Sequence, residues 1–283
     1  MLPIAIAIPS LNQGRFLEAA LRSLIDPSGV SVRLAFVDGG STDDTLAIAE
    51  RYSRHFSFAR SRPDEGQAAA INEGLARLLA LHADVGAVGW LNADDVMVPG
   101  GLAALAGALE ANPSWLAVAG RGQVFGEDGA VTGEYRTAPF SKKAFARACR
   151  FCQPATLIRR EAWERVGGLD TTFDMSFDYD LWWRLAALGP MGFVDVVAAA
   201  SREHADTKTR TRRRDYFRES MAIVQRETGR VGWHWCISEA LERQDGWSPT
   251  PQLGLASKAA AGVKALATYA GRNFLGACPW TRP

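Results

Sequence analysis

The stretch Trp90-Leu91-Asn92-Ala93-Asp94-Asp95 decides the fold that this sequence predicts. The apolar run 85–91 indicates a buried strand, because small and branched apolar residues without alternation suit a sheet that is covered on both faces. The run stops at Asn92, two carboxylates follow, and Pro99 before Gly100-Gly101 indicates the start of a helix that continues to Ala111. The carboxylates are therefore predicted to lie at the carboxyl end of a central strand, where open α/β sheets bind ligands.

The adjacent carboxylates Asp94 and Asp95 allow two interpretations. Unpaired carboxylates at such a place are costly unless a positive charge lies beside them. Hard oxygen ligands on a short loop suit Mg2+ or Mn2+ that also holds a substrate phosphate. The alternative is a solvated Asp-Asp turn that caps the next helix, and the pair alone does not decide between the two.

Composition and charge indicate an ordinary globular protein. The chain has 283 residues, of which 47% are apolar and 22% charged, with a net charge of +1, so the whole chain is not a nucleic-acid platform. Residues 1–140 hold 10 Lys and Arg against 16 Asp and Glu, whereas residues 141–283 hold 22 against 15. This asymmetry indicates a cation-binding part beside an anion-binding or surface-facing part, unless the surface charge is placed by chance.

Cysteine use and hydropathy predict a cytoplasmic protein. Cys149 and Cys152 have the spacing of a redox or half-zinc motif, but no second close pair completes a zinc site. We therefore expect reduced thiols. The apolar start of the chain indicates a strand rather than a signal peptide, and no stretch is long and apolar enough to span a bilayer.

Strand and helix patterns alternate three times in the first hundred residues. The apolar runs 4–8, 34–37 and 85–91 are separated by helical patterns, which predicts βαβ units and a largely parallel sheet. Ser41 with Asp44 resembles a capping box for the second helix. The doubly wound order would bring Asp38, Asp64 and Asp94 to one edge of the sheet, and several acidic turns at one edge are stronger evidence than one.

The rest of the chain predicts a mixed sheet and a helical tail. Strands are expected at 115–125, 131–136, 153–158 and 193–200, and helices at 141–150, 160–166, 178–188 and 210–228. Pro249-Thr250-Pro251 is the best candidate boundary before a helix over 255–275.

At this point the chain resembles the inverting family 2 glycosyltransferases of the GT-A fold, over about residues 3–210. The matching stretches are 8–12 (Ile-Pro-Ser-Leu-Asn), 36–45, 64–67 leading to 72–74, 90–95 and 178–184. The ordered set is specific, although each piece alone is not. The resemblance implies a Rossmann-like, mostly parallel or mixed sheet flanked by helices. It also implies a domain over 1–210, with a nucleotide-sugar half (1–112) and an acceptor half (113–210), and a helical extension over 211–283.

The resemblance also implies a nucleotide-sugar donor site. Asp38 would accept the N3–H of uracil or a related base, Pro9 and Asn12 would line the base and ribose, and Asp64 would be a second nucleoside contact. Asn92 stands where the family has the first Asp of its Asp-x-Asp motif. The whole donor set is Pro9, Ser10, Asn12, Asp38, Asp64, Gln67, Asn72, Asn92 and Lys208.

For catalysis the resemblance implies Asp178 as the general base, and the alternative is an N-cap of its helix. The divalent metal, Mg2+ or Mn2+, would be held by Asp94 with Asp95 in support, and by His204, although a lone histidine can equally be structural. Gln153 and Trp182 would face the acceptor, and a buried glutamine that satisfies strand ends is the alternative for Gln153.

The helical tail has two interpretations. Helical projection puts Leu255, Val263, Leu266, Tyr269 and Phe274 on one face and Lys258, Lys264 and Arg272 on the other. This pattern suits peripheral contact with the inner face of a plasma membrane, and equally a helix packed on its own domain.

The expected function is metal-dependent, inverting transfer of a sugar from a nucleoside diphosphate, expected to be UDP, to an acceptor hydroxyl. A glycan or glycolipid acceptor in bacterial surface polysaccharide or lipopolysaccharide synthesis is the implied setting. The sequence lacks Gln-x-x-Arg-Trp, which disfavours a processive synthase. The alternatives are a nucleotidyltransferase, for which residues 9–12 offer no Gly-rich basic loop, and a non-catalytic nucleotide-sugar binder.

Overall fold

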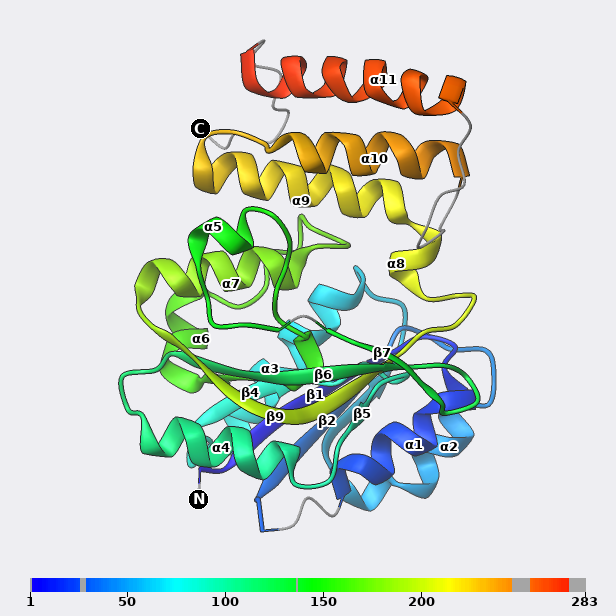
Figure 1. Cartoon of the computed structure of the whole chain (residues 1–283). Helices are drawn as coiled ribbons and strands as arrows, with labels where there is room; N and C mark the ends of the chain where they lie inside the picture. The colour runs from blue at the N-terminus through cyan, green and yellow to red at the C-terminus, as the bar shows by residue number, and fades with distance from the viewer. Residues whose placement is uncertain (1, 26–28, 136, 246–254, 275–283) are drawn as a thin grey trace. The chain divides into compact units, whose positions relative to one another are not determined.

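The computed structural model describes residues 2–25, 29–135, 137–245 and 255–274, and the chain forms two compact units (Figure 1). The first unit consists of Met1–Phe140 and Arg150–His204. The second consists of Ser141–Cys149 and Ala205–Pro283.

The first unit is built on a mixed sheet whose order is β3-β2-β1-β4-β8-β6-β9-β5, with β7 paired to β6. Neighbours are parallel from β3 to β4 and between β6 and β9, and the other pairs are antiparallel. The strands are β1 (Ile4–Ser10), β2 (Val32–Asp38), β3 (Phe56–Ser61), β4 (Ala87–Trp90), β5 (Val96–Met97), β6 (Ala117–Phe125), β7 (Val131–Glu134), β8 (Thr156–Arg159) and β9 (Met191–Arg202).

Helices cover both faces of this sheet. In Figure 1, α1, α2 and α4 lie on one side and α6 and α7 on the other. The helical elements of this unit are α1 (Gly14–Ile25), α2 (Thr45–Arg51), η1 (Ser53–His55), α3 (Gln67–Leu81), α4 (Gly101–Ala111), η2 (Gln153–Ala155), α6 (Arg160–Val166) and α7 (Phe177–Leu188).

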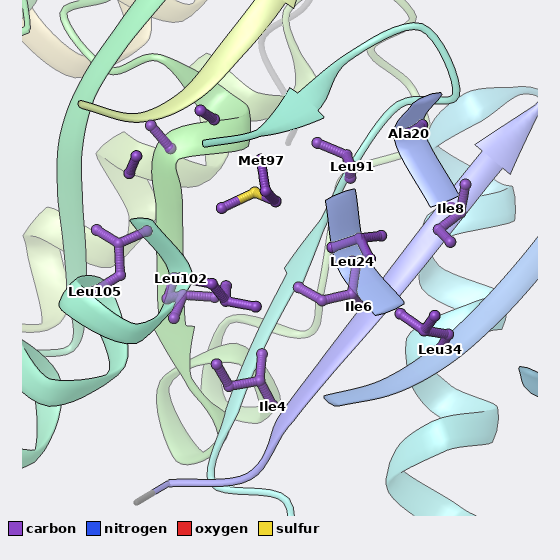
Figure 2. Close-up of a cluster of buried hydrophobic side chains, with 14 of the residues drawn as sticks. Ile4, Ile6, Ile8, Ala20, Leu24, Leu34, Leu91, Met97, Leu102 and Leu105 are labelled. Atoms are coloured by element: carbon purple, nitrogen blue, oxygen red, sulfur yellow. The ribbon is translucent and has the colours of Figure 1, made fainter. Parts of the chain in front are cut away.

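Strand β1 is buried along its whole length, and its side chains alternate in size between its two faces. Ile4, Ile6 and Ile8 enter the main core cluster with residues of α1 and α4 (Figure 2). Ala5 and Ala7 face the other way, where α3 packs close: a Cβ on Gly74 of α3 would lie 3.1 Å from the Cβ of Ala7. Large residues on one face and small ones on the other thus allow two helical layers at different distances.

The predicted parallel order of the strands at 4–8, 34–37 and 85–91 is confirmed. Strand β3 was not predicted, and its side chains alternate between half-buried and exposed, as expected at a sheet edge. Residues 153–155, predicted as a strand, form a 3-10 turn, because Pro154 has no N–H for a sheet ladder. Residue 136 of the predicted strand 131–136 lies outside the described residues.

The second unit is helical. It contains α5 (Lys142–Phe145), α8 (Lys208–Thr211), α9 (Arg213–Thr228), α10 (Trp233–Asp245) and α11 (Leu255–Phe274), and α10 packs against α9 and α11. The predicted helix 210–228 is interrupted at Arg212, and α10 was not predicted. Trp235 Nε1 donates to Ala146 O at 2.8 Å, which joins α10 to the segment after α5. Within the described residues, no helix has the length and apolar character to cross a membrane.

Two glycines of α4 should respond oppositely to alanine. A Cβ at Gly101 would lie 2.3 Å from Ala198 O and 2.5 Å from Ala198 Cα on β9, whereas a Cβ at Gly107 would meet no atom of the described residues within 4 Å. Gly101→Ala should therefore lower the free energy of unfolding by about 1–3 kcal/mol, because backbone must move apart. Gly107→Ala should raise it by up to about 1 kcal/mol, because glycine weakens a helix interior. Urea denaturation of both variants measures this, and equal stability of Gly101→Ala and the parent would contradict the close approach of α4 to β9.

Candidate active site

The loops after β1, β2 and β4 emerge at one edge of the sheet. In the parallel register Ser10 lies beside Asp38, and Ala7 lies beside Trp90. The carboxyl ends of these three strands are therefore neighbours, and the polar residues that follow each strand share one edge.

The loops after β1 and β2 are tied together by Asn12. Its backbone has a φ of 53°, a left-handed conformation that asparagine tolerates better than most residues. Its N–H donates to Ser41 Oγ at 2.7 Å, and its Oδ1 accepts the N–H of Thr42 at 2.8 Å. The predicted capping box is wrong. The N-cap residue of α2 is Asp44, whose side chain makes no capping hydrogen bond, and the hydroxyl of Ser41 is bonded to Asn12 N and Asp38 Oδ1 instead.

Asp38 is completely buried and organises the loop that follows it. Its Oδ2 accepts the N–H groups of Gly40 and Ser41, both at 2.9 Å, and the hydroxyl of Ser61 at 2.7 Å. Its Oδ1 accepts Ser41 Oγ–H at 2.5 Å. The hydrogen bond to a nucleoside base stays a prediction.

Arg60 connects the turn that contains Asp64 to the end of β2. Its Nη1 lies 3.1 Å from Asp64 Oδ2 and 2.6 Å from Asp38 O, and its Nη2 lies 2.7 Å from Glu73 Oε2. Asp64 Oδ1 also accepts the N–H of Gly66 at 2.9 Å. The structure thus brings Asp64 to the same edge as Asp38, and its role as a nucleoside contact stays a prediction.

The side chain of Asp94 contacts His204, which follows strand β9. His204 Nε2 lies 3.1 Å from Asp94 Oδ2, and Arg15 Nη2 lies 3.1 Å from His204 Nδ1. A guanidinium can only donate, so Nδ1 accepts, and the proton of a neutral ring lies on Nε2 and points at Asp94. The ring is buried against Phe16, with centroids 4.8 Å apart. Arg15 also pairs with Glu127 at 3.5 Å.

Asp95 is buried and internally bonded. Its Oδ1 accepts the N–H of Arg202 at 3.0 Å, and its Oδ2 accepts Asn92 Nδ2 at 3.1 Å. Gln67 Nε2 continues this chain by donating to Asn92 Oδ1 at 2.7 Å. Burial, and then the neighbouring Asp94, hold the pKa of Asp95 well above its ordinary value. Asp95 is therefore bonded within the protein, to Arg202 and Asn92, and its support of a metal stays a prediction.

Asp94 and His204 fit a divalent cation as a pair of protein ligands. No cluster of three or more His, Cys, Asp or Glu side chains among the described residues could hold an ion by itself. A pair is sufficient where the substrate supplies the remaining oxygens, as is usual for Mg2+. Ligation through Nε2 would move the ring proton to Nδ1, so Arg15 would have to leave its present position.

Asp178 occupies the first turn of α7, one residue after the start of the helix. Its Oδ1 accepts the N–H of Tyr179 at 2.7 Å. Burial raises the pKa of Cys152, and the charges of Asp95 and Asp178 raise it further. The ring of Phe177, which precedes Asp178, lies 6.3 Å from the ring of Trp90, so the start of α7 lies near the end of β4, which the Asp94–Asp95 turn follows. Its role as a base stays a prediction, and one oxygen already satisfies a helix N–H.

Other predicted site residues have structural partners. Asn72 clasps the backbone of Leu169, accepting its N–H and donating to its O, both at 2.9 Å. Trp182 is completely buried and stacks on Trp90 with centroids 6.2 Å apart, so it packs the core rather than forming an exposed acceptor surface. Gln153 Nε2 donates to Trp90 O at 2.8 Å, which agrees with its structural alternative.

The remaining predicted donor residues differ in position. Pro9 and Ser10 end β1, and the buried Ser10 Oγ has no hydrogen-bond partner within the part of the chain that the structure describes, so it can serve a ligand. Lys208 belongs to the second unit, as the first residue of α8, and its phosphate contact stays a prediction.

Sequence reasoning gave no role to Arg15, Arg60 and Arg202. Arg202 donates from Nε to Asp94 O at 3.1 Å, and its guanidinium lies over the rings of Phe16 and Phe125 at 4.5 and 4.2 Å. Arg15 and His204 are 189 residues apart in the chain, so no local spacing reports their contact.

Comparisons with solved structures place this fold among the GT-A glycosyltransferases. The Staphylococcus aureus protein TarS (residues 1–349), solved in complex with UDP-GlcNAc, superposes with a TM-score of 0.65 at 15% identity, over 96% of this chain and 82% of that one. The mannosyltransferase PcManGT from Pyrobaculum calidifontis, solved with GDP-Man and Mn2+, superposes with a TM-score of 0.60 at 18% identity, over 99% of this chain and 77% of that one.

The chain belongs to glycosyl transferase family 2, whose sequence profile matches residues 5–167. Among curated relatives, the O-antigen biosynthesis protein RfbC of Myxococcus xanthus is 34% identical over 60% of this chain and 13% of its own length. The chondroitin synthase of Escherichia coli is 19% identical over 81% of this chain and 33% of its own length. The chain thus spans a third or less of the length of these two relatives, and it is a glycosyltransferase by family.

Proposed function

We propose that this chain transfers a sugar, with inversion, from a nucleoside diphosphate to an acceptor hydroxyl, and that the transfer depends on Mg2+ or Mn2+. The observation that carries the proposal is the pair Asp94 Oδ2 and His204 Nε2, 3.1 Å apart at the edge where β1, β2 and β4 end. An oxygen and a nitrogen ligand that converge at this edge suit a cation shared with a diphosphate.

The complexes of similar proteins support the class of donor. TarS has been solved with UDP and with UDP-GlcNAc, and PcManGT with GDP-Man and Mn2+. Both nucleotides are diphosphates, so the shared chemistry is a nucleoside diphosphate sugar. We propose UDP as the nucleotide of this chain, and the nucleotide panel below decides between the bases.

The nucleotide-sugar half of the predicted 1–210 domain, residues 1–112, is proposed to bind the donor. The end of β1 presents Pro9 and the hydroxyl of Ser10, and the loop that follows presents Asn12, with Asp38 as the predicted base contact. Asp64 lies at the same edge through Arg60. Asn92, held between Gln67 and Asp95, has its amide position fixed from both sides, so it can orient the ribose without rearranging.

Asp178 is proposed to activate the acceptor. Its carboxylate takes the proton of the acceptor hydroxyl while that oxygen forms a bond to the anomeric carbon and the bond from this carbon to the diphosphate breaks. The attack opposite to the leaving group inverts the configuration. A divalent cation, when bound, would offset the negative charge that develops on the leaving diphosphate. Asp94 and His204 would hold it, with Arg15 displaced from His204 Nδ1.

The acceptor half is proposed to lie within 113–210, where η2 and α7 face the end of β4. Gln153 fixes this part of the chain to Trp90 O, so its contribution is to position the backbone there. The names of relatives, a chondroitin synthase and an O-antigen biosynthesis protein, support a glycan or glycolipid acceptor. We propose surface polysaccharide assembly as the setting.

Ligand-dependent thermal stability tests this proposal. The full chain is heated with UDP, GDP, CDP and dTDP sugars, each with Mn2+, with Mg2+ or with a chelator. One nucleotide sugar should raise Tm only when a cation is present, and about 100-fold excess over Kd should add about 2.7 kcal/mol to stability. Free Mn2+ with no nucleotide is the control. An equal rise of Tm with the chelator would contradict cation dependence, and no rise with any nucleotide sugar would contradict the donor class.

A further inference from the structure

The outermost helix of the second unit, α11, packs with the opposite face from the one its large residues predict. Ala261 and Ala265 are completely buried, whereas Val263, Leu266 and Phe274 are 71%, 60% and 76% exposed. Tyr269 and Arg272, predicted on opposite faces, are both half-buried. The small residues Ala261 and Ala265 therefore pack inside the second unit, whereas the large apolar side chains of Val263, Leu266 and Phe274 lie at its surface.

The exposed face of α11 carries no acidic residue. Over residues 257–274, where the structure describes side chains, each exposed residue is apolar or lysine. These residues are Lys258, Ala259, Ala260, Val263, Lys264, Leu266, Ala267 and Phe274. At 3.6 residues per turn, the large apolar side chains share one stripe, and Lys258 and Lys264 fall on either side of it. An apolar stripe flanked by lysines is the pattern of a helix that lies in a membrane interface.

The charge of the unit identifies the partner of this stripe. Residues 141–149 and 205–283 hold 16 Lys and Arg against 7 Asp and Glu, a net charge of +9, whereas the rest of the chain carries −8. A second copy of the same unit would bring +9 against +9, which opposes self-association. A surface of anionic lipid complements both features, because headgroups attract the lysines and acyl chains receive the apolar side chains.

We propose that the outer face of α11 docks on an anionic lipid bilayer, with Val263, Leu266 and Phe274 inserted at the headgroup boundary. Anchoring there needs no membrane-spanning helix, and it would place the enzyme at a surface that presents lipid-linked acceptors. The docking itself depends only on the second unit, so it stands apart from the donor chemistry proposed above.

Vesicle sedimentation of the full chain tests the docking. The protein is mixed with vesicles of phosphatidylglycerol and phosphatidylcholine in equal parts, and with vesicles of phosphatidylcholine alone. The parent should sediment with the first and not with the second, and raising salt from about 0.1 M to about 1 M should release it, because the Debye length falls from about 10 Å to about 3 Å. Equal binding to both vesicles, or to neither, would overturn the proposal.

The stripe is tested by Val263→Ser/Leu266→Ser/Phe274→Ser, with Leu81→Ser/Val131→Ser/Leu188→Ser as the matched control. The control residues are also exposed and belong to the first unit. The α11 variant should lose at least about ten-fold in vesicle partition, because three apolar side chains no longer enter the interface, and the control should keep parental binding. Lys258→Gln/Lys264→Gln should weaken binding and its salt dependence.

Two further readouts separate docking from packing. The α11 variant should keep the parental Tm without vesicles, and a lower Tm would mean that the stripe is covered within the chain. Sedimentation velocity without lipid should give the same mass for parent and variant, and a parental dimer that the variant loses would assign the stripe to a second copy. Either result would overturn the proposal.

Discussion

Asp178→Asn is expected to lower sugar transfer by about 10²–10⁴-fold, the usual contribution of a positioned general base. An asparagine keeps the volume of the side chain, and its carbonyl oxygen can still accept the N–H of Tyr179, so α7 should be unchanged. What it lacks is the ability to take the acceptor proton. Nucleoside diphosphate release, with the donor selected by thermal shift, measures the loss.

Donor binding distinguishes a base from a structural residue at position 178. The donor-dependent rise of Tm should be the same in Asp178→Asn and the parent, because the predicted role is toward the acceptor. Asp195→Asn is the matched control, since it removes the same charge from a 78% exposed side chain of the first unit, and it should keep parental turnover. Parental turnover in Asp178→Asn would remove this residue as the base.

Asp94→Asn is expected to lower the affinity for Mn2+ in the presence of donor by more than about 10–100-fold. That range is typical when a residue outside the ligand sphere is lost, so a direct ligand should cost at least as much. The amide keeps one oxygen but has no charge to hold the cation. Calorimetric titration of Mn2+ into the protein with the bound nucleotide sugar measures the change.

The neighbouring carboxylate gives a contrast for Asp94. Both oxygens of Asp95 accept hydrogen bonds, from Arg202 N and from Asn92 Nδ2, so an amide there would point its NH2 group at a donor. Asp95→Asn should therefore lower the free energy of unfolding by about 1–3 kcal/mol. Asp94→Asn, whose side chain is partly exposed, should unfold at nearly the parental denaturant concentration. An unchanged Mn2+ affinity in Asp94→Asn would contradict its place at the cation.

The parallel core and its polar edge could be predicted from the sequence because both are local signals. The Ile-Ala alternation of 4–8 and the apolar run that ends at Trp90 are strand patterns, and the acidic residues follow the strands directly. Strand β3 also alternates, over Phe56–Ser61, but three of its six residues are serine or arginine, so it lacks an apolar run like the one that marks β4.

The partners of the site residues could not be predicted, because they come from distant parts of the chain. Arg202 and Asp95 are 107 residues apart, and Asn72 and Leu169 are 97 apart. Asn72 is an example. Its place in a family motif implied contact with the donor, yet its amide nitrogen and oxygen are both bonded to the backbone of Leu169. For α11, the hydrophobic pattern gave two faces but not which one packs, and in the structure it is Ala261 and Ala265 that are buried.

The reciprocal hydrogen bonds between Asn12 and residues 41–42 bear on the thermodynamics of ligand capture. Since these turns are held to each other by the protein's own hydrogen bonds, an arriving nucleotide has little backbone to order there. Ordering a flexible residue costs about 1–2 kcal/mol of conformational entropy. A binding loop that is already ordered therefore lowers the entropic cost of binding by several such contributions. Nucleotide association at this part of the edge should consequently be fast, and the rearrangement that the proposed cation site requires is the withdrawal of Arg15 from His204.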